Sequence, residues 1–485
     1  MARTILFLSP KCALDDRSGA ARSVRNILTS LAGAGWAAQS VTMTLFDGAS
    51  EYPLARVVGD AAASPENHGR FLEVARDGVR HRMFRTASTV DGRATEREAA
   101  AFYQGAAEIL AAERPDVVLL YGSSALSRRL INLAGEVAGS LVFYLANPGY
   151  DDAALFRPMD RVLVPSEFLA ATYRQRLGLD PRVLPDPIRA DEAPAPEDVL
   201  AVAEPARRRF GFVTLMNPFP PKGGTLFWRM AEMAGRERPD LLFLAVEGRM
   251  PAEAWTRAGF DLAERANVWW LPNQPDVRPI LARTSVLLFP SFWDEPSGRG
   301  VAEAQLAGIP VLGANHGGIP EQLNGGGFAL DVPARCRFDS HRHVPTEAEA
   351  RPWLDTVHGL MDDEAFYRDA IRRALAAAEP FRPEQSAARI AACFEGLPVP
   401  ASPRPTVPET PAASGTADTA APAPSAPNLL DPGPTALDAR PRFEAPAPPP
   451  ARERADPSAA SARKKPGRNA PCPCGSGRKH KHCCA

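Results

Sequence analysis

Two glutamates, Glu295 and Glu303, stand eight positions apart on either side of a turn that contains Ser297, Gly298 and Arg299. An apolar run, VLLFPS, precedes the turn, and a run of small residues, VAEAQLAG, follows it. These patterns predict a strand, a loop and the start of a helix, where backbone N–H groups and the helix dipole favour a bound phosphate. A carboxylate on each side of that phosphate can accept hydrogen bonds from sugar hydroxyls. The spacing therefore suits a nucleotide-sugar, which carries hydroxyls at both ends and a diphosphate between them.

Lys222 is a second candidate phosphate ligand, because it follows an apolar run in the segment MNPFPPKGG. An ammonium group here can reach a diphosphate, while Gly223 and Gly224 let the backbone come close to it. An exposed loop lysine without a ligand is the alternative interpretation. Glu303 has an alternative too, because the helix dipole alone favours a glutamate in a first turn by about 0.3–1 kcal/mol. The whole string of residues favours the binding interpretation over these alternatives.

The string resembles the donor site of retaining GT-B glycosyltransferases of the family 4 type. In that family E-x7-E is followed by EA-x-x-x-G-x-P-V and GG-x-P-E, which here are residues 303–311 and 317–321. The resemblance implies that Glu303 holds ribose hydroxyls, that Glu295 contacts the transferred sugar in a catalytic role, and that Lys222 binds the diphosphate. It also implies that the anomeric configuration is retained. The resemblance is strong in the second half of the chain and weaker in the first.

The resemblance adds further donor-binding candidates. The turn residues Ser297 and Gly298 lie within the matched string, and the Gly317-Gly318 pair is expected close to the sugar or phosphate unless it is a simple turn. Gly19, in the first βα loop, matches a glycine-containing loop of the family, and a plain capped helix N-terminus is the alternative. The family's chemistry needs no metal, because positive charge and helix dipoles stabilise the leaving nucleoside diphosphate.

Two asparagines depart from the family pattern. Asn217 stands five positions before Lys222, where an arginine is usual, and we expect Arg299 to supply the missing positive charge. Asn147 stands where a histidine near the reacting sugar is common. We count Asn147 as a catalytic candidate because its amide can hydrogen-bond a sugar hydroxyl, although it cannot change charge. These departures leave open a donor-binding protein without turnover.

Short apolar strands alternate with helical segments along most of the chain, which predicts parallel sheets covered on both faces. TILFLS, SVTMTLF, DVVLLYG, SLVFYLA and DRVLVPS are strand candidates of the first half, and RFGFVTLMN, DLLFLAV, NVWWLP, SVLLFPS and IPVLGA of the second. We predict an α/β protein with two Rossmann-like doubly wound domains facing a cleft. Residues 1–188 form the acceptor domain and residues 189–396 the donor domain. Ligands of such sheets bind at the carboxyl ends of the strands, where the motifs lie.

The length and composition limit the number of domains and the classes of partner and compartment that we expect. The chain has 485 residues, 45% of them hydrophobic, and a formal net charge of −1. This length exceeds one typical domain, and the charge gives no argument for nucleic acid or membrane binding by the whole protein. No run is apolar enough to span a bilayer, and the N-terminus lacks the features of a signal peptide. We therefore expect a cytoplasmic protein, in which Cys12, Cys336 and Cys393 are packing residues.

Beyond the second domain the sequence changes character. Residues 397–463 are rich in Pro, Ala, Ser and Thr and hold few large apolar side chains, which predicts a disordered linker. The last segment, residues 464–485, has a C-x-C-x8-C-C pattern with two glycines between the cysteine pairs. Four thiolates so close together suit tetrahedral Zn²⁺ in a structural role, and binding the metal would fold the segment. The predicted ligands are Cys472, Cys474, Cys483 and Cys484.

This segment closely resembles the SEC-C motif at the C-terminus of the preprotein translocase ATPase, where the motif binds a partner and is not catalytic. The module and its immediate flank are strongly basic, with Arg463, Lys464, Lys465, Arg468, Arg478, Lys479 and Lys481. A basic module on a long tether suggests docking onto an acidic protein face, a ribosome or another anionic partner, with a solubilising tail as the alternative. We therefore expect a glycosyltransferase with an unknown acceptor and a zinc-binding docking tail. The competing hypothesis is a non-catalytic GT-B protein that binds nucleotide-sugars or acts as an adaptor.

Overall fold

The computed structural model of this chain describes most of residues 2–410. The described residues are 2–48, 50–193, 208, 211–248, 250–260, 265–274, 276–340, 343–397 and 404–410. Met1–Leu430 form one compact unit and Asp431–Ala485 a second, and all described residues belong to the first. The predicted zinc module and most of the predicted linker lie outside the described residues. None of the helices in the described ranges is both long and apolar enough for a membrane span.

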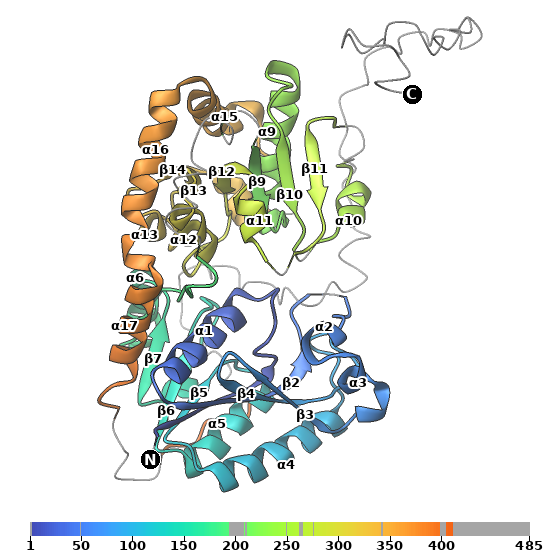
Figure 1. The fold of residues 1–485 in the computed structure, drawn as a ribbon, viewed down its shortest axis with the longest axis vertical. Helices are drawn as coiled ribbons and strands as arrows, with labels where there is room; N and C mark the ends of the chain where they lie inside the picture. The colour runs from blue at the N-terminus through green and yellow to red at the C-terminus, as the bar shows by residue number, and fades with distance from the viewer. Residues whose placement is uncertain are drawn as a thin grey trace, which may run out of the picture. The chain divides into compact units, whose positions relative to one another are not determined.

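Eight strands of the described N-terminal half form one sheet, in the order β3-β4-β2-β1-β5-β6-β7-β8 (Figure 1). The strands are β1 (Thr4–Lys11), β2 (Ala37–Leu45), β3 (Phe71–Arg76), β4 (Val79–Phe84), β5 (Val117–Leu120), β6 (Ser140–Tyr144), β7 (Arg161–Val164) and β8 (Arg182–Val183). All neighbours pair in parallel except β3 and β4. The helices are α1 (Gly19–Gly33), α2 (Ala55–Val58), α3 (Asp60–Ala63), α4 (Glu96–Glu113), α5 (Ala125–Val137) and α6 (Glu167–Leu177). The antiparallel β3-β4 pair was not among the predicted strands.

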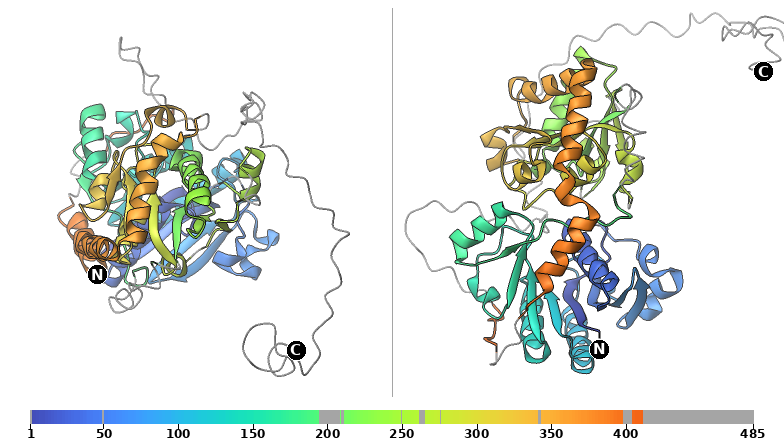
Figure 2. Two further views of the ribbon diagram at one scale, coloured as in Figure 1. Left: turned by 90° about the horizontal axis from the view of Figure 1, so that it is seen from above. Right: turned by 60° about the vertical axis from the view of Figure 1, so that its left-hand side comes forward.

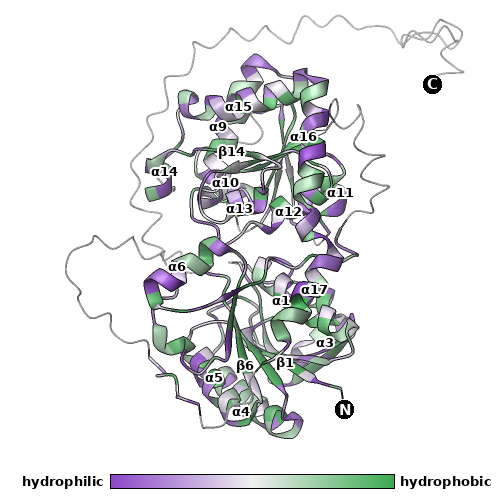
Figure 3. Cartoon of the chain, turned by 90° about the vertical axis from the view of Figure 1, so that its left-hand side faces the viewer, coloured by the Kyte–Doolittle hydropathy of each residue, from purple (hydrophilic) through white to green (hydrophobic). Residues whose placement is uncertain are grey.

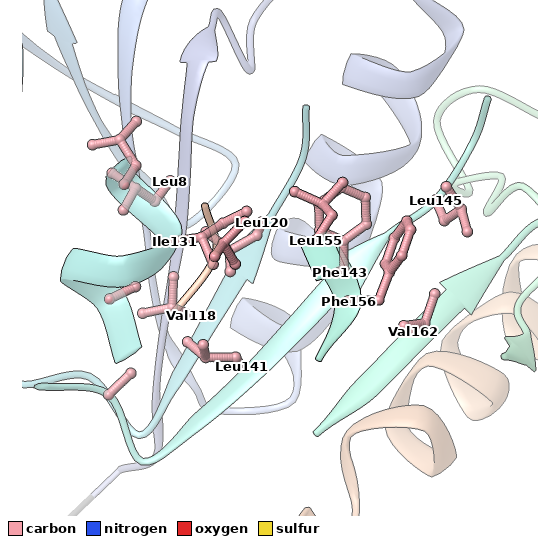
Figure 4. Close-up of a cluster of buried hydrophobic side chains, with 14 of the residues drawn as sticks. Leu8, Val118, Leu120, Ile131, Leu141, Phe143, Leu145, Leu155, Phe156 and Val162 are labelled. Atoms are coloured by element: carbon pink, nitrogen blue, oxygen red, sulfur yellow. The ribbon is translucent and has the colours of Figure 1, made fainter. Parts of the chain in front are cut away.

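Continuous apolar strands explain why this sheet is covered on both faces. Leu8, Val118, Leu120 and Phe143 pack against α4, α5 and α6 on one face, in a cluster shown in Figure 4. On the other face, α1 packs its apolar side against alternate residues of the same strands. Figure 3 shows this pattern by hydropathy: the central strands are coloured as hydrophobic, whereas outer helices such as α16 carry both hydrophobic and hydrophilic residues.

A second sheet of six described strands has the order β11-β10-β9-β12-β13-β14, and all its pairs are parallel. The strands are β9 (Phe212–Met216), β10 (Phe243–Val246), β11 (Val268–Leu271), β12 (Thr284–Phe289), β13 (Val311–Ala314) and β14 (Phe328–Leu330). The helices are α9 (Gly224–Glu237), α10 (Ala252–Arg257), α11 (Arg278–Leu281), α12 (Arg299–Leu306), α13 (Ile319–Leu323), α14 (Ala334–Phe338), α15 (Glu347–Asp362) and α16 (Glu364–Ala377). Helices α9, α15 and α16 cover one face, and α12 and α13 the other. The predicted pair of Rossmann-like α/β folds is therefore confirmed.

The last described helix, α17 (Pro383–Phe394), returns to the N-terminal sheet. Its residues Ile390, Cys393 and Phe394 join the buried cluster beneath α1, and Figure 2 shows α17 beside α1. Arg182 of β8 fixes the helix end by donating to the carbonyl oxygen of Ala392 at 3.0 Å. The C-terminal part of the chain thus contributes to the core of the N-terminal half.

One short stretch of the predicted linker, residues 404–410, packs against the N-terminal half, so the prediction of disorder is wrong there. The Arg404 guanidinium pairs with Asp160 at 2.5 Å, and their side chains are 7% and 14% exposed. Val407 is 2% exposed, and its backbone N–H and carbonyl oxygen both bond to the Asn132 side chain, at 2.7 and 2.9 Å. The amino-acid composition of residues 397–463 did not predict this contact, because it averages over the whole segment. The interactions of two residues, Arg404 and Val407, are enough to hold residues 404–410 against the N-terminal half.

Candidate functional site

A cleft of about 570 Å³ lies where loops of the two sheets meet. The N-terminal half contributes the loop after β1, the start of α1 and the loop after β6. The C-terminal half contributes the loop after β9 and the loop between β12 and α12. The lining residues from the sequence-predicted set are Gly19, Asn147, Lys222, Glu295, Ser297, Gly298 and Arg299. These positions come from distant parts of the chain, and the fold brings them together.

Lys222 and Glu295 form an ion pair inside the cleft. The Lys222 ammonium lies 2.5 Å from Glu295 Oε1, with side chains 22% and 6% exposed. Ser291 Oγ donates a second hydrogen bond to the same oxygen at 2.7 Å. Lys222 also lies over the Trp293 ring, 5.0 Å from its centroid, where the ring quadrupole attracts the cation. The two side chains that the sequence assigned to phosphate and sugar are therefore adjacent and hold one another.

The backbone of the loop that carries Lys222 is fixed by a glycine. Gly223 has φ +80°, and a Cβ atom at this position would lie 2.2 Å from the Pro290 carbonyl oxygen. Only glycine allows this close approach in a left-handed conformation. The approach brings Lys222 against the loop after β12, and the Phe292 N–H donates to the Pro221 carbonyl oxygen at 2.8 Å.

Glu303 lies one turn inside α12 and is 7% exposed. Its Oε1 accepts a hydrogen bond from Arg299 Nε at 2.7 Å, and Arg22 of α1 reaches the same atom at 3.4 Å. Arg299 also donates to Glu192 Oε2 and to the Pro187 carbonyl oxygen, each at 2.6 Å. Burial alone would lower the pKa of Arg299, but Glu303 and Glu192 raise it above its usual range. Arg299 is therefore charged, and its hydrogen bonds link Glu303 to Pro187 and Glu192 in the segment that joins the two halves.

The hydrogen bonds of Arg299 argue against the expectation that its charge replaces the arginine missing at position 217. Arg299 lines the cleft, yet its Nε and both terminal nitrogens already donate to protein acceptors. A phosphate contact would have to break one of these short bonds. Asn217 is not among the lining residues, and its side chain lies so close to Gly248 that a Cβ there would be 2.3 Å from the Asn217 amide oxygen.

The Gly317-Gly318 pair supports the Glu295 loop from behind and does not line the cleft. Gly317 has φ +64°, and a Cβ there would lie 2.8 Å from the Glu295 backbone nitrogen. The Gly318 N–H donates to the Glu295 carbonyl oxygen at 2.8 Å. Its own Cβ would lie 2.7 Å from the Pro296 carbonyl oxygen. In this structure the pair therefore sets the position of Glu295, while the predicted contact with a ligand stays a prediction.

On the opposite wall, Asn147 is exposed and its Oδ1 accepts the Gly149 N–H at 2.8 Å. This bond leaves the Nδ2 group of Asn147 for other partners in the cleft. Gly19 begins α1, directly after Ser18, whose side chain caps the helix by accepting the Ala21 N–H. A Cβ at Gly19 would meet nothing within 4 Å. The absence of a side chain there opens the cleft toward the helix N-terminus, as a bound anion would require.

Sequence reasoning missed several polar residues of this wall. Lys11 and Asp47 line the cleft, and so does Asp15, which is 3% exposed. Burial raises the pKa of Asp15 to about 7, against the effect of the backbone N–H groups of Asp47 and Arg17 that it accepts. Their positions at the carboxyl ends of the TILFLS and SVTMTLF strands were the available signal, because ligands bind at that edge of a parallel sheet.

Two buried hydrogen-bond donors in the C-terminal half also have no hydrogen-bond partner among the described residues. Ser297 Oγ and the Trp293 indole nitrogen have no hydrogen-bond partner among the described residues, and both residues line the cleft. Buried polar atoms are normally paired, so such atoms in a cleft favour a polar ligand there. The sequence predicted Ser297, whereas Trp293 carried no motif signal.

Two further contacts join the halves beside the cleft. Ser166 Oγ donates to the Pro296 carbonyl oxygen. The Glu321 carboxylate accepts the backbone N–H groups of Glu167 and Phe168, at 3.0 and 3.2 Å, at the start of α6. A carboxylate at a helix N-terminus is stabilised by the dipole. Glu321, the last residue of the GG-x-P-E string, therefore forms hydrogen bonds between the two halves.

Metal ligands were predicted only in the C-terminal module. Cys472, Cys474, Cys483 and Cys484 lie outside the described residues. Within the described ranges, no group of three or more His, Cys, Asp or Glu side chains is arranged to hold a metal ion. Cys12, Cys336 and Cys393 are buried free thiols, as expected for packing residues.

Comparisons with known proteins agree with the two strongest sequence signals. Residues 207–336 match the family model described as Glycosyl transferases group 1, and residues 468–485 match that of the SEC-C motif. The chain therefore resembles GT-B glycosyltransferases and carries a SEC-C motif. The comparison with curated protein sequences gave no match.

Solved structures share the fold. The Anabaena protein HepE in complex with UDP and glucose has a TM-score of 0.56 at 16% identity, over 81% of this chain and 100% of its own. Sucrose-phosphate synthase from Thermosynechococcus elongatus has a TM-score of 0.60 at 16% identity, over 81% and 99%. An α,α-trehalose-phosphate synthase (UDP-forming) from Burkholderia vietnamiensis has a TM-score of 0.53 at 11% identity, over 82% and 97%. At these identities the likeness establishes the fold, which is GT-B.

Proposed function

We propose that this protein is a retaining glycosyltransferase that moves a sugar from a nucleotide-sugar donor to an acceptor bound on the N-terminal half. The observation that carries the proposal is the cleft in which Lys222 and Glu295 meet, and whose lining residue Arg299 donates a hydrogen bond to Glu303. The family model that matches residues 207–336 supports sugar transfer independently. HepE, one of the proteins with this fold, was solved in complex with UDP-glucose.

The residues of the cleft divide the chemistry between them. Lys222 leaves Glu295 for the diphosphate, where its charge stabilises the nucleoside diphosphate as the glycosidic bond breaks. Glu295, freed from Lys222, accepts hydrogen bonds from hydroxyls of the transferred sugar. Glu303 accepts the ribose hydroxyls. The start of α1, with Ser18 and Gly19, presents its N–H groups to the phosphates from the other wall.

A panel of UDP-, GDP- and ADP-sugars tests the proposal, scored by thermal stabilisation and by nucleotide release. We expect one donor to stabilise the protein and to be hydrolysed slowly in the absence of an acceptor. Glu303→Ala should abolish that stabilisation, while an exposed control, Arg97→Gln on α4, should leave it unchanged. Anomeric configuration of the product, read by NMR, tests retention separately. Stabilisation that persists in Glu303→Ala contradicts the assignment of the ribose site.

The second candidate is a GT-B protein that binds nucleotide-sugars without transferring them. Asn147 supports it, because this cleft residue cannot exchange a proton and its Oδ1 is already bonded to the Gly149 N–H. The same panel separates the two candidates. A donor that stabilises the protein, with no turnover in the presence of glycan, lipid and protein acceptors, favours the binding protein. Turnover that is lost in Glu295→Gln excludes it.

The C-terminal module adds a docking function to either candidate. The four cysteines of the SEC-C motif hold structural Zn²⁺, and the basic residues around them bind an acidic protein face, a ribosome or another anionic partner. The anchor at residues 404–410 ties the start of this tail to the acceptor half. The buried free thiols of the described core support a reducing compartment, and we place the protein in the cytoplasm.

A further inference from the structure

Protein contacts hold several polar side chains of the loop between β12 and α12. Ser291 Oγ donates to Glu295 Oε1 at 2.7 Å. Asp294 Oδ1 lies 2.9 Å from His316 Nδ1 and accepts a hydrogen bond from Arg337 at 2.7 Å. These contacts, with the support that the site description gives for the loop backbone, fix the loop before any ligand arrives.

Two polar groups of the same loop have no such partner. The Trp293 indole N–H and the Ser297 hydroxyl are buried and form no hydrogen bond with any described residue. Both residues line the cleft, two positions before and two positions after Glu295. A buried donor without a partner costs stability, and buried polar groups in native proteins are therefore nearly always paired. Two such groups beside one carboxylate indicate that a ligand supplies their partners.

Trp293 also adjoins the two residues assigned to the sugar donor. The Lys222 ammonium lies 5.0 Å from the centroid of the indole ring and 2.5 Å from Glu295 Oε1. In a nucleotide-sugar the transferred sugar is bonded directly to the diphosphate, so its binding site must adjoin the phosphate-binding lysine. When Lys222 moves to the diphosphate, as proposed above, it leaves both the indole ring and the Glu295 carboxylate to the sugar.

The chemistry of these groups matches that of sugar hydroxyls. A hydroxyl donates one hydrogen bond and accepts others, so its recognition needs both an acceptor and a donor. The Glu295 carboxylate accepts, the Trp293 indole N–H only donates, and the Ser297 hydroxyl can do either. We propose that Trp293, together with Ser297, determines which sugar is transferred by donating hydrogen bonds to the oxygen atoms of its hydroxyls. This inference rests on the proposed function and names the residues that select the sugar.

The test uses the full-length protein and the nucleotide-sugar that stabilises wild type most in the panel above. Trp293→Phe removes the indole N–H but keeps an aromatic ring beside Lys222, and Ser297→Ala removes the hydroxyl. The matched control is Trp269→Phe, because Trp269 is 57% exposed on β11 and is not among the residues that line the cleft. Calorimetry measures the affinity of each protein for the nucleotide-sugar and for its nucleoside diphosphate.

We expect Trp293→Phe and Ser297→Ala each to bind the nucleotide-sugar about 3–10-fold more weakly, as for the loss of one neutral hydrogen bond. Their affinity for the nucleoside diphosphate should stay unchanged, because that ligand lacks the sugar. The control should change neither affinity. Thermal unfolding without ligand identifies a Trp293→Phe protein that fails to fold, in which case Ser297→Ala, the smaller change, decides.

Donor analogues that lack one sugar hydroxyl identify the hydrogen bond itself. Wild type should bind one deoxy analogue more weakly than the complete donor, because the protein group that faced the missing hydroxyl is left unpaired. Trp293→Phe should discriminate less between this analogue and the complete donor. A residue that only supports the loop would weaken both ligands by the same factor, and an unchanged ratio of their affinities therefore overturns the inference.

The remaining outcomes separate this inference from the proposed function. An equal loss of affinity for the nucleotide-sugar and the nucleoside diphosphate in a folded variant would assign the two groups to phosphate and refute their role in selecting the sugar. Full affinity of both variants for the nucleotide-sugar would refute the inference alone, since donor binding itself would stand. If wild type binds no nucleotide-sugar, the proposed function and the inference fall together.

Discussion

Replacing Lys222 with methionine should destabilise the protein as well as remove a phosphate contact. Lys222 neutralises Glu295, a carboxylate that is 5% exposed and that also accepts a hydrogen bond from the Ser291 hydroxyl at 2.7 Å. Lys222→Met keeps the aliphatic stem over Trp293 but leaves the carboxylate uncompensated. The resemblance predicts only a loss of donor binding, whereas the geometry predicts a loss of stability too.

The size of the effect follows from the burial of the two partners. Removing one member of a fully buried pair costs about 3–5 kcal/mol. The Lys222 side chain is 22% exposed, so water can reach the carboxylate once the ammonium is gone. We therefore expect a loss of about 1–3 kcal/mol, between the values for buried and exposed pairs. For a compact unit of this size, Met1–Leu430, this corresponds to a fall in melting temperature of about 1–3 °C.

A double-mutant cycle isolates the interaction. Lys222→Met, Glu295→Gln and the double variant are compared with wild type by urea unfolding followed by tryptophan fluorescence. Because Glu295→Gln removes the buried negative charge, the double variant should be more stable than Lys222→Met alone. A coupling free energy below about 0.5 kcal/mol, the limit for independent sites, would refute the reasoning. Full affinity of Lys222→Met for the nucleoside diphosphate would refute the phosphate role separately.

Burial raises the pKa of Asp15 from its ordinary value of 3.8 to about 7, so between these pH values the folded state holds a proton that the unfolded state has lost. Wild-type stability should therefore fall as pH rises through this window, and Asp15→Asn should show a smaller fall when melting temperatures are compared from pH 4.5 to 8; equal slopes would contradict the effect. Arg404→Ala should release residues 404–410, because it removes the 2.5 Å pair with Asp160. Hydrogen exchange should then quicken at Val407 with donor binding unchanged, and unchanged protection would show that the anchor does not depend on the arginine. Cys472→Ser with Cys474→Ser should lower the zinc content measured by mass spectrometry without weakening donor binding, and a wild-type protein without zinc would rule the metal out.

Local patterns in the sequence were enough to predict most of the strands of both sheets and the order of the motif around Glu295 and Glu303. The runs before Lys222 and Glu295 are short and apolar, and they become β9 and β12. Strands β3 and β4 were missed, because charged residues interrupt the apolar pattern of FLEVAR and VRHRMF, and these strands are ordered by pairing with each other and with β2. The anchor of residues 404–410 was missed for a related reason, since its partners Asp160 and Asn132 are far away in the sequence.

The roles of individual site residues depended on tertiary contacts. Residue type alone suggested that Arg299 was available for phosphate, but Glu192 and Pro187, more than a hundred positions away, take its donors.

The sequence by itself determined the alternation of strands and helices, the donor string around Glu295 and Glu303, and the cysteine spacing of the tail, because each depends on residues close together in the chain. The tertiary structure decided which wall each charged group faces and which charges neutralise one another. Electrostatic interactions depend on the distance between two charges and on their exposure to water. The order of residues along the chain specifies neither the distance nor the exposure. The pairing of Lys222 with Glu295 and that of Arg299 with Glu192 and Glu303 therefore became visible only in the fold.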